Sequence, residues 1–178
     1  MDMIVYDSVL GKSDPPSTTV LDIKNDPDGL PDGSYAFIEY YCSVPYCDCR
    51  VMNIEVYQVI SEENEKTQVH DESLALIQYG WDTEEFYKEM RERMDSDCNF
   101  HGASLHPDHK QSKFADVILD IFRLMLEQDE DFKLQLEEHY YDLKFKMKER
   151  AKNPIPVKSS VQPPSFLPSL RKKRSKLR

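Results

Sequence analysis

The sequence predicts an α+β domain, in which a small antiparallel β-sheet is followed by about three α-helices. Segments 34–42 and 49–60 are rich in aromatic and β-branched residues, which is typical of strands, and only a short turn separates them. Segments 113–128 and 129–152 instead place apolar residues at helical spacing. Strands followed by helices, without regular alternation of the two, indicate an α+β arrangement.

The predicted sheet consists of a hairpin over residues 34–60 and a third strand over residues 73–80. The second strand of the hairpin alternates, which places one apolar set on the core side: Met52, Ile54, Val56 and Ile60. The first strand is apolar in both phases, so its core side stays open between two sets: Ala36, Ile38 and Tyr40, or Tyr35, Phe37 and Tyr41. The third strand is apolar in both phases too, which indicates a central position. Residues 18–23 predict a short strand before the hairpin, and residues 62–66 predict a polar turn after it.

The helices are expected after the sheet. Asp82, with Glu85 three residues later, resembles a capping box and predicts the start of the first one. The next helix is apolar around much of its circumference, so we expect it to be buried. The last helix is amphipathic. Between the first two helices, residues 95–111 show little periodicity and predict a loop.

We expect one domain over residues 1–152 and a disordered tail over residues 153–178. The tail holds five of the eleven prolines and no acidic residue, a composition that buries too little apolar surface to offset the entropy lost on ordering. Because the whole chain carries a net charge of −10, an acidic body precedes this basic tail. The body does not suit nucleic acid, whereas the tail could contact phosphate groups or nucleic acid through its basic run: Arg171, Lys172, Lys173, Arg174 and Lys176.

The sequence contains no transmembrane segment, because no apolar stretch is long enough to span a bilayer. The N-terminus also lacks the basic and apolar regions of a secretory signal, so we expect a cytoplasmic protein. Thiols stay reduced in that compartment unless they bind metal or carry out redox chemistry. The cysteines are therefore better interpreted as metal ligands than as disulfide partners.

Three of the four cysteines, Cys42, Cys47 and Cys49, lie close together between the two hairpin strands. A short hairpin loop over residues 43–46 would place Cys42 opposite Cys47, and Cys49 would share the face of Cys47. Three sulfurs would then converge on one point, which suits Zn²⁺. Cys98 or His101 would complete a closed, structural zinc site.

Two other functions stay open. If water fills the fourth position, the metal could serve a hydrolase or a nucleic-acid-processing enzyme, with His101 or His106 as the acid–base group. If Cys42 and Cys47 oxidise to each other, the chain could be a thiol redox protein. Glycine-rich phosphate-binding motifs and the nucleophile-elbow motif do not occur in the sequence. We expect His139, on the last helix, to form a hydrogen bond with a loop.

Residues 40–50 read Tyr-Tyr-Cys-x4-Cys-Asp-Cys-Arg and precede a strand. This segment resembles the N-terminal domain of uncharacterised bacterial proteins that often end in a SEC-C zinc-binding motif, and weaker similarities follow at residues 79–81, 111–115 and 139–140. The resemblance implies a prokaryotic cytosolic protein with a cysteine-bound metal and no assigned activity. No cysteine follows Cys98, so the SEC-C motif itself is not in this sequence, and its association with protein export and translation does not transfer.

The leading interpretation is a non-enzymatic, zinc-stabilised protein-interaction domain with a flexible basic tail. Its expected metal ligands are Cys42, Cys47 and Cys49, with Cys98 preferred to His101 as the fourth. The expected partner is another protein.

Overall fold

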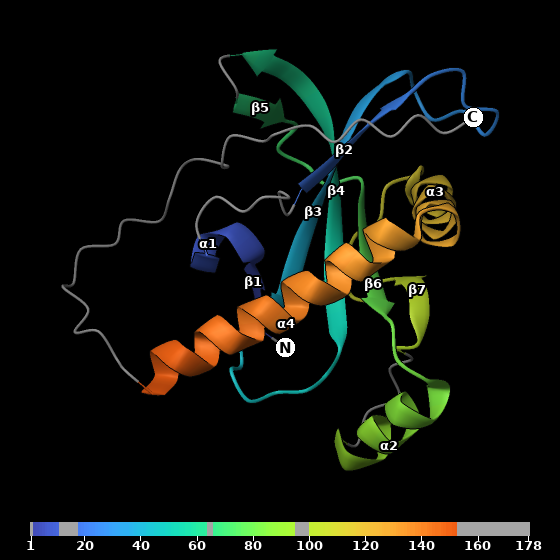
Figure 1. Cartoon of the computed structure of the whole chain (residues 1–178). Coiled ribbons are helices and arrows are strands. Elements are labelled where there is room, and N and C mark those ends of the chain that lie inside the picture. Colours follow the sequence, from blue (N-terminus) through green and yellow to red (C-terminus); the bar gives the residue numbers. More distant parts are fainter. Residues whose placement is uncertain (1, 11–17, 64–65, 95–99, 153–178) are drawn as a thin grey trace.

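The computed structural model of the chain describes residues 2–10, 18–63, 66–94 and 100–152. Within these ranges, seven strands form one antiparallel sheet and the longest helices pack against it (Figure 1). The predicted α+β fold is confirmed, with more strands than expected. The prediction of a disordered tail over residues 153–178 lies outside the described residues.

The sheet has two long central strands with shorter strands on either side. In chain order the strands are β1 (Met3–Val5), β2 (Thr18–Ile23), β3 (Gly33–Cys42), β4 (Val51–Glu63), β5 (Lys66–Val69), β6 (Ala75–Gly80) and β7 (Gly102–Leu105). Their order across the sheet is β1-β3-β4-β6-β7, while β2 also pairs with β3, and β5 with β4. Each long strand therefore has two short neighbours, one after the other, along its outer edge.

The described ranges hold the helices α1 (Tyr6–Leu10), α2 (Glu84–Met94), α3 (Ala115–Gln128) and α4 (Glu130–Lys152). Helices α1 and α2 lie between strands in the chain, whereas α3 and α4 follow the last strand. The cap of α2 is Thr83, one residue after the predicted Asp82, because the Thr83 hydroxyl accepts a hydrogen bond from the N–H of Phe86 (3.2 Å). The Asp129 carboxylate caps α4 in the same way, accepting from the N–H of Phe132 (2.9 Å). None of the helices in the described ranges is long and apolar enough to cross a membrane.

Strand register sets the face of the sheet that α3 and α4 cover. Tyr41 lies opposite Met52, and Met52 lies opposite Tyr79, so these three side chains share one face. On the same face, the Phe37 ring stacks on Phe122 of α3, with 6.4 Å between centroids. The sequence left two alternatives for the core side of β3. The structure shows that the set of Tyr35, Phe37 and Tyr41 faces the helices.

Ile60 departs from the prediction for β4. The other three apolar residues of its set are buried, but Ile60 is 58% exposed. The pairing of β4 with β5 shifts between Val59 and Ser61, which leaves Ile60 at a β-bulge. A bulge interrupts the alternation of the strand, so the apolar pattern does not continue to this position.

The elements β1, α1, β5 and β7 were not predicted. β7 lies inside the expected loop over residues 95–111, and β5 begins in the expected turn over residues 62–66. Such short strands form because they pair with the edge of a long neighbouring strand, and their own residues show little preference for strand conformation. Beyond β7 the same edge is extended by Gln111, whose side-chain amide pairs with both the N–H and the C=O of Leu76 (3.1 Å each).

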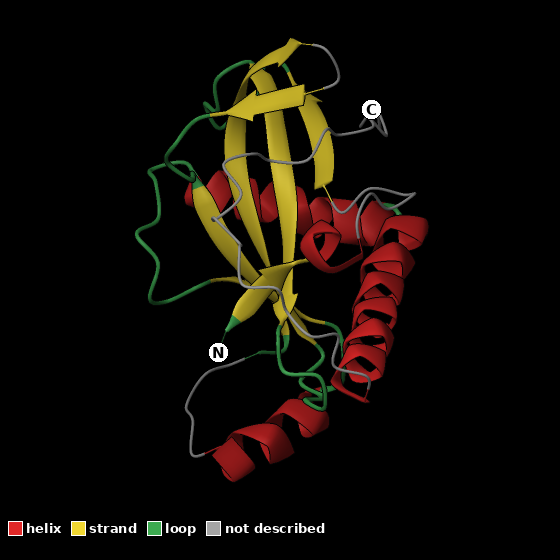
Figure 2. Ribbon diagram, turned by 90° about the vertical axis from the view of Figure 1, so that its left-hand side faces the viewer, coloured by secondary structure: helices red, strands yellow, loops and turns green. Residues whose placement is uncertain are grey.

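Helix α4 lies across the covered face of the sheet (Figure 2), and one polar cluster is buried beneath it. Glu39 is 1% exposed and points from β3 toward α4, where its Oε2 lies 2.7 Å from Nδ1 of His139. The Tyr41 hydroxyl donates to the same oxygen (2.8 Å), and the Tyr6 ring stacks on His139 at 4.4 Å. The predicted hydrogen bond of His139 therefore joins the last helix to the sheet and not to a loop.

Candidate metal centre

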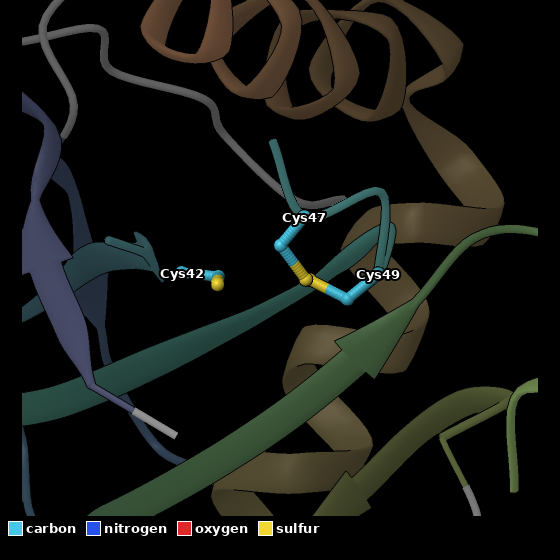
Figure 3. Close-up of side chains that lie close together, drawn as sticks. All are labelled: Cys42, Cys47 and Cys49. Atoms are coloured by element: carbon cyan, nitrogen blue, oxygen red, sulfur yellow. The ribbon is translucent and has the colours of Figure 1, made fainter. Parts of the chain in front are cut away.

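Three cysteines gather where β3 ends and the chain returns to β4 (Figure 3). Cys42 is the last residue of β3, and Cys47 and Cys49 belong to the cysteine loop, residues 43–50. Their ligand atoms all lie within 4.8 Å of one another, and the three thiols are free. Cys42 and Cys49 are buried, whereas Cys47 is partly exposed. This arrangement could hold a metal ion.

The cysteine loop is longer than the predicted turn. β3 and β4 pair as far as Tyr41 and Met52, so Cys47 lies within the loop and not opposite Cys42 on a paired strand. A turn inside the loop is closed by the Cys47 N–H, which donates to the carbonyl of Val44 (3.2 Å). The predicted cross-strand geometry is therefore wrong. The sulfurs meet because the loop folds back on the end of β3.

Arg50 ends the loop in a left-handed backbone conformation, with φ of 50°. This conformation is uncommon for residues other than glycine, and hydrogen bonds hold it at both backbone groups. The Tyr87 hydroxyl donates to the Arg50 carbonyl (2.6 Å), and the Arg50 N–H donates to the Tyr140 hydroxyl (3.3 Å). Its guanidinium also pairs with Asp48 (2.9 Å). The path of the chain just after Cys49 is thus fixed by side chains from α2 and α4.

Helix α4 also holds the carbonyl groups of the loop. Lys144 is buried, and its ammonium donates to the carbonyls of Cys42 (2.8 Å) and Val44 (2.7 Å). One turn earlier, the Tyr140 hydroxyl donates to the carbonyl of Cys47 (3.2 Å). A buried ammonium needs such acceptors to offset its lost hydration. The loop and α4 are therefore one packed unit, and a positive charge lies beside the sulfurs.

The thiols share their protons unequally. The pKa of Cys42 is lowered to about 5, chiefly by a hydrogen bond from Cys49, which outweighs the effect of burial, and to a lesser extent by the backbone of Val44 and the Lys144 ammonium. The same hydrogen bond raises the pKa of Cys49 well above its ordinary range. Burial, followed by the negative charge of Cys42, raises the pKa of Cys47. Without a cation, the cluster accommodates one thiolate and keeps two thiols protonated.

A metal ion would remove this obstacle to ionisation. Cysteine binds metal as the thiolate, so a cation among the sulfurs displaces the protons that burial and mutual repulsion otherwise retain. Clustered thiolates are the donors preferred by Zn²⁺, Cu⁺ and iron–sulfur centres. The chemistry that this site can perform is therefore the binding of a thiophilic metal ion.

The predicted fourth ligands and acid–base groups lie elsewhere or are not described. Cys98 lies outside the described residues. The Nδ1 atom of His101 is 2.8 Å from the carbonyl oxygen of Asp82, and His106 accepts a hydrogen bond from the N–H of Asp108 (3.3 Å). Among the described residues, the group of ligand atoms includes the three cysteines and neither imidazole.

The side chains that support the cysteine loop were not identified from the sequence. Tyr140 and Lys144 were expected only as part of an amphipathic helix, although their spacing of four residues places them on one face. A lysine on the buried side of a helix was the signal that could have pointed to them, because it needs buried acceptors. Tyr87 and Arg50 carried no comparable signal, since a left-handed arginine is not readable from composition.

Comparison of the chain with protein-family models, with curated proteins and with solved structures found no match. The resemblance to SEC-C-associated bacterial proteins stays a prediction. A function for this chain has to be inferred from the geometry of its cysteine site.

Proposed function

We propose that the chain is a non-enzymatic, zinc-stabilised protein-interaction domain. The observation that carries this proposal is the group of three cysteine ligand atoms within 4.8 Å of one another. A metal at this point would join the end of β3 to a loop held by α4, so its binding energy would contribute to folding. We propose Zn²⁺ because it binds several thiolates and has no redox chemistry of its own.

Cys98 is the proposed fourth ligand, and His101 is the alternative. Either one would close the coordination sphere, which is typical of structural and not of catalytic zinc. The cytoplasm is the compartment that fits free thiols retained for metal binding. The basic tail over residues 153–178 is proposed as a separate contact site for acidic or phosphorylated partners.

The metal part of the proposal is tested by thermal unfolding with and without a strong chelator, under reducing conditions. We expect the chelator to lower the melting temperature, and one equivalent of Zn²⁺ to restore it, because metal binds the folded chain and not the unfolded one. The Cys47→Ser variant should have a lower melting temperature that does not change when the chelator is added. A melting temperature that does not respond to the chelator would contradict the proposal.

The fourth ligand is tested by replacing the metal with Co²⁺, whose absorption reports the number of bound thiolates. We expect Cys98→Ser to weaken the thiolate bands and His101→Ala to leave them unchanged. The opposite pattern would assign the fourth position to His101. Unchanged spectra in both variants would indicate an open fourth position, which favours the metal-dependent hydrolase.

A thiol redox function is the second candidate, and the pKa of Cys42, lowered to about 5, favours it. A thiolate there could attack a disulfide or another oxidant and then form a disulfide with Cys47. Differential alkylation of the native protein separates the two candidates. Zinc-protected thiols support the structural function, whereas a Cys42–Cys47 disulfide that forms reversibly at cytosolic potentials supports the redox function.

A further inference from the structure

Helix α4 carries a second apolar side that faces away from the sheet. Leu134, Tyr141 and Phe145 are 49%, 51% and 60% exposed. They are seven and four residues apart, so all three fall within about 40° of one another around the helix. We call these three side chains the outer stripe.

The outer stripe is not part of the domain core. The opposite side of α4 is buried against the sheet, where Leu136 and Leu143 are fully covered. In Figures 1 and 2 no other described element lies on the outer side of α4. Single exposed apolar residues are ordinary on protein surfaces, whereas several in one line form an apolar face of the kind that marks a contact surface.

Charge along α4 changes sign near its middle. Residues 130–141 contain four acidic residues and one basic residue, whereas residues 142–152 contain two acidic and five basic residues. Acidic residues near the start of a helix and basic residues near its end stabilise the helix dipole. That effect is confined to the terminal turns, and it does not account for Glu138 and Lys148, which lie outside those turns and on either side of Tyr141 and Phe145.

The spacing along this side follows a coiled-coil seam. Positions at alternating intervals of four and three residues form one line, as a and d positions do in a heptad: Leu134, Glu138, Tyr141, Phe145, Lys148 and Lys152. In a parallel pair of such helices each residue meets its own copy, so Glu138 would face Glu138 and like charges would repel.

In an antiparallel pair the same residues become complementary. With the two-fold axis between Tyr141 and Phe145, Tyr141 of one copy meets Phe145 of the other. Glu138 then faces Lys148. Leu134 faces Lys152, whose methylene groups can cover it while the ammonium stays in water. A two-fold axis produces each of these contacts twice, as in most homodimers.

We propose that the outer stripe of α4 binds the same stripe of a second copy of this chain, in antiparallel orientation. The inference rests on the proposed function, since it names the partner of the interaction domain, but it does not require the metal. A helix of this length is about 35 Å long. A contact made by one such helix per copy is at the small end of specific interfaces, so the dimer is weak and exchanges readily with monomer.

The test is sedimentation velocity of the full zinc-loaded chain over the micromolar to millimolar range. We expect a monomer–dimer equilibrium, and Tyr141→Glu should weaken it about tenfold or more, the equivalent of about 1.4 kcal/mol. Ile60→Glu is the matched control, because Ile60 is as exposed as the stripe residues but lies on β4. The control should dimerise normally. A chain that stays monomeric, or a Tyr141→Glu variant with unchanged affinity, would overturn the proposal.

Orientation is tested by reversing charges. Glu138→Lys and Lys148→Glu should each weaken the dimer, and the double variant should restore it, because the exchanged charges again face each other. A double variant as weak as the single ones would rule out the antiparallel seam. Zinc content is measured on every sample: loss of dimer with zinc retained refutes this inference alone, whereas a dimer without zinc refutes only the metal proposal.

Discussion

Two polar clusters lie where α4 packs against β3 and the cysteine loop, and their polar groups have different kinds of partner. In the first, Glu39 and His139 are 2.7 Å apart, and Tyr41 donates to the same carboxylate. The Glu39 carboxyl group there contacts an imidazole and a hydroxyl group of the same chain. In the second, the sulfurs of Cys42, Cys47 and Cys49 meet one another.

The difference between them shows what the cysteine cluster lacks. In the first cluster, the fold itself supplies both hydrogen-bond partners of Glu39 Oε2. Among the described residues, Glu39 Oε1 and His139 Nε2 are buried without a hydrogen-bond partner. Three thiols do not readily ionise side by side. The hydrogen bond between Cys49 and Cys42 lowers the pKa of Cys42 and raises that of Cys49, while burial, followed by the charge of Cys42, raises the pKa of Cys47. The nearby Lys144 ammonium supplies positive charge that favours the thiolates of Cys42 and Cys47. A bound cation would allow all three cysteines to ionise.

The largest expected effect comes from removing a metal ligand. Structural zinc contributes on the order of 10 kcal/mol of binding energy to small folds. We expect Cys49→Ala to lower the free energy of unfolding by about 5 kcal/mol, a fall of more than about 10 °C in melting temperature. Calorimetry of zinc-loaded samples measures this. If the variant melts within about two degrees of the wild-type chain, as a change without structural consequence does, the cysteines hold no structural metal.

Breaking the first cluster should have the next largest effect. Glu39→Ala leaves His139 buried without its partner, which typically costs about 3–5 kcal/mol. Replacing both residues by apolar ones, as in Glu39→Leu with His139→Phe, should cost less than the single change, because no polar group is stranded. Denaturant unfolding of the two variants measures the difference. A double variant that is less stable than Glu39→Ala would contradict this account of the pair.

Lys144→Met tests the link between α4 and the cysteine loop. The change removes the donors to two buried carbonyls, for which we expect a loss of about 2 kcal/mol. It also frees the backbone at Cys42 and Val44 from α4, so the sulfurs should be less well positioned and zinc affinity should fall. Lys146→Met, two residues along and exposed, is the control and should match the wild-type chain in both respects. Equal zinc affinity in the two variants would show that these contacts do not position the sulfurs.

Zinc affinity should rise with pH. The pKa of Cys42 is lowered to about 5, so this thiol is already ionised at neutral pH, whereas the raised pKa values of Cys47 and Cys49 keep both protonated. Metal binding at pH 7 therefore releases about two protons from Cys47 and Cys49, and a third from Cys98 if that thiol is the fourth ligand. The affinity should increase about a hundredfold for each pH unit with His101 in the fourth position and about a thousandfold with Cys98. Competition with a chelating dye of known protonation behaviour measures the slope. An affinity independent of pH between 6 and 8 would contradict the proton distribution described for the cluster.

The main elements of the fold were predictable because each repeats a local pattern. β2 matches the predicted strand over residues 18–23, and α3 and α4 follow the predicted helical segments within two residues. Short elements such as β7 were not predictable, since pairing with a neighbour and not their own composition makes them strands. The prediction that Ile60 lies on the core side was wrong for a related reason, because the β-bulge at this position depends on pairing with the partner strand.

The proximity of the three cysteines in the candidate site was predictable, but the geometry of the loop that brings them together was not. Three cysteines in so short a segment had to lie near one another, whatever the turn between them. The route by which they meet depends on Arg50, whose left-handed backbone is held by Tyr87 and Tyr140. These tyrosines come from α2 and α4, far along the chain. Contacts over such separations leave no mark in the local sequence.

The most direct test of the metal centre is the metal content of the native chain, purified under reducing conditions without added metal. Elemental analysis and thiol titration are done on the same sample. We expect one equivalent of zinc and cysteines that react with a thiol reagent only after a chelator is added. A metal-free protein whose cysteines react at once would contradict the account, because the cysteine cluster would then be stable without a cation.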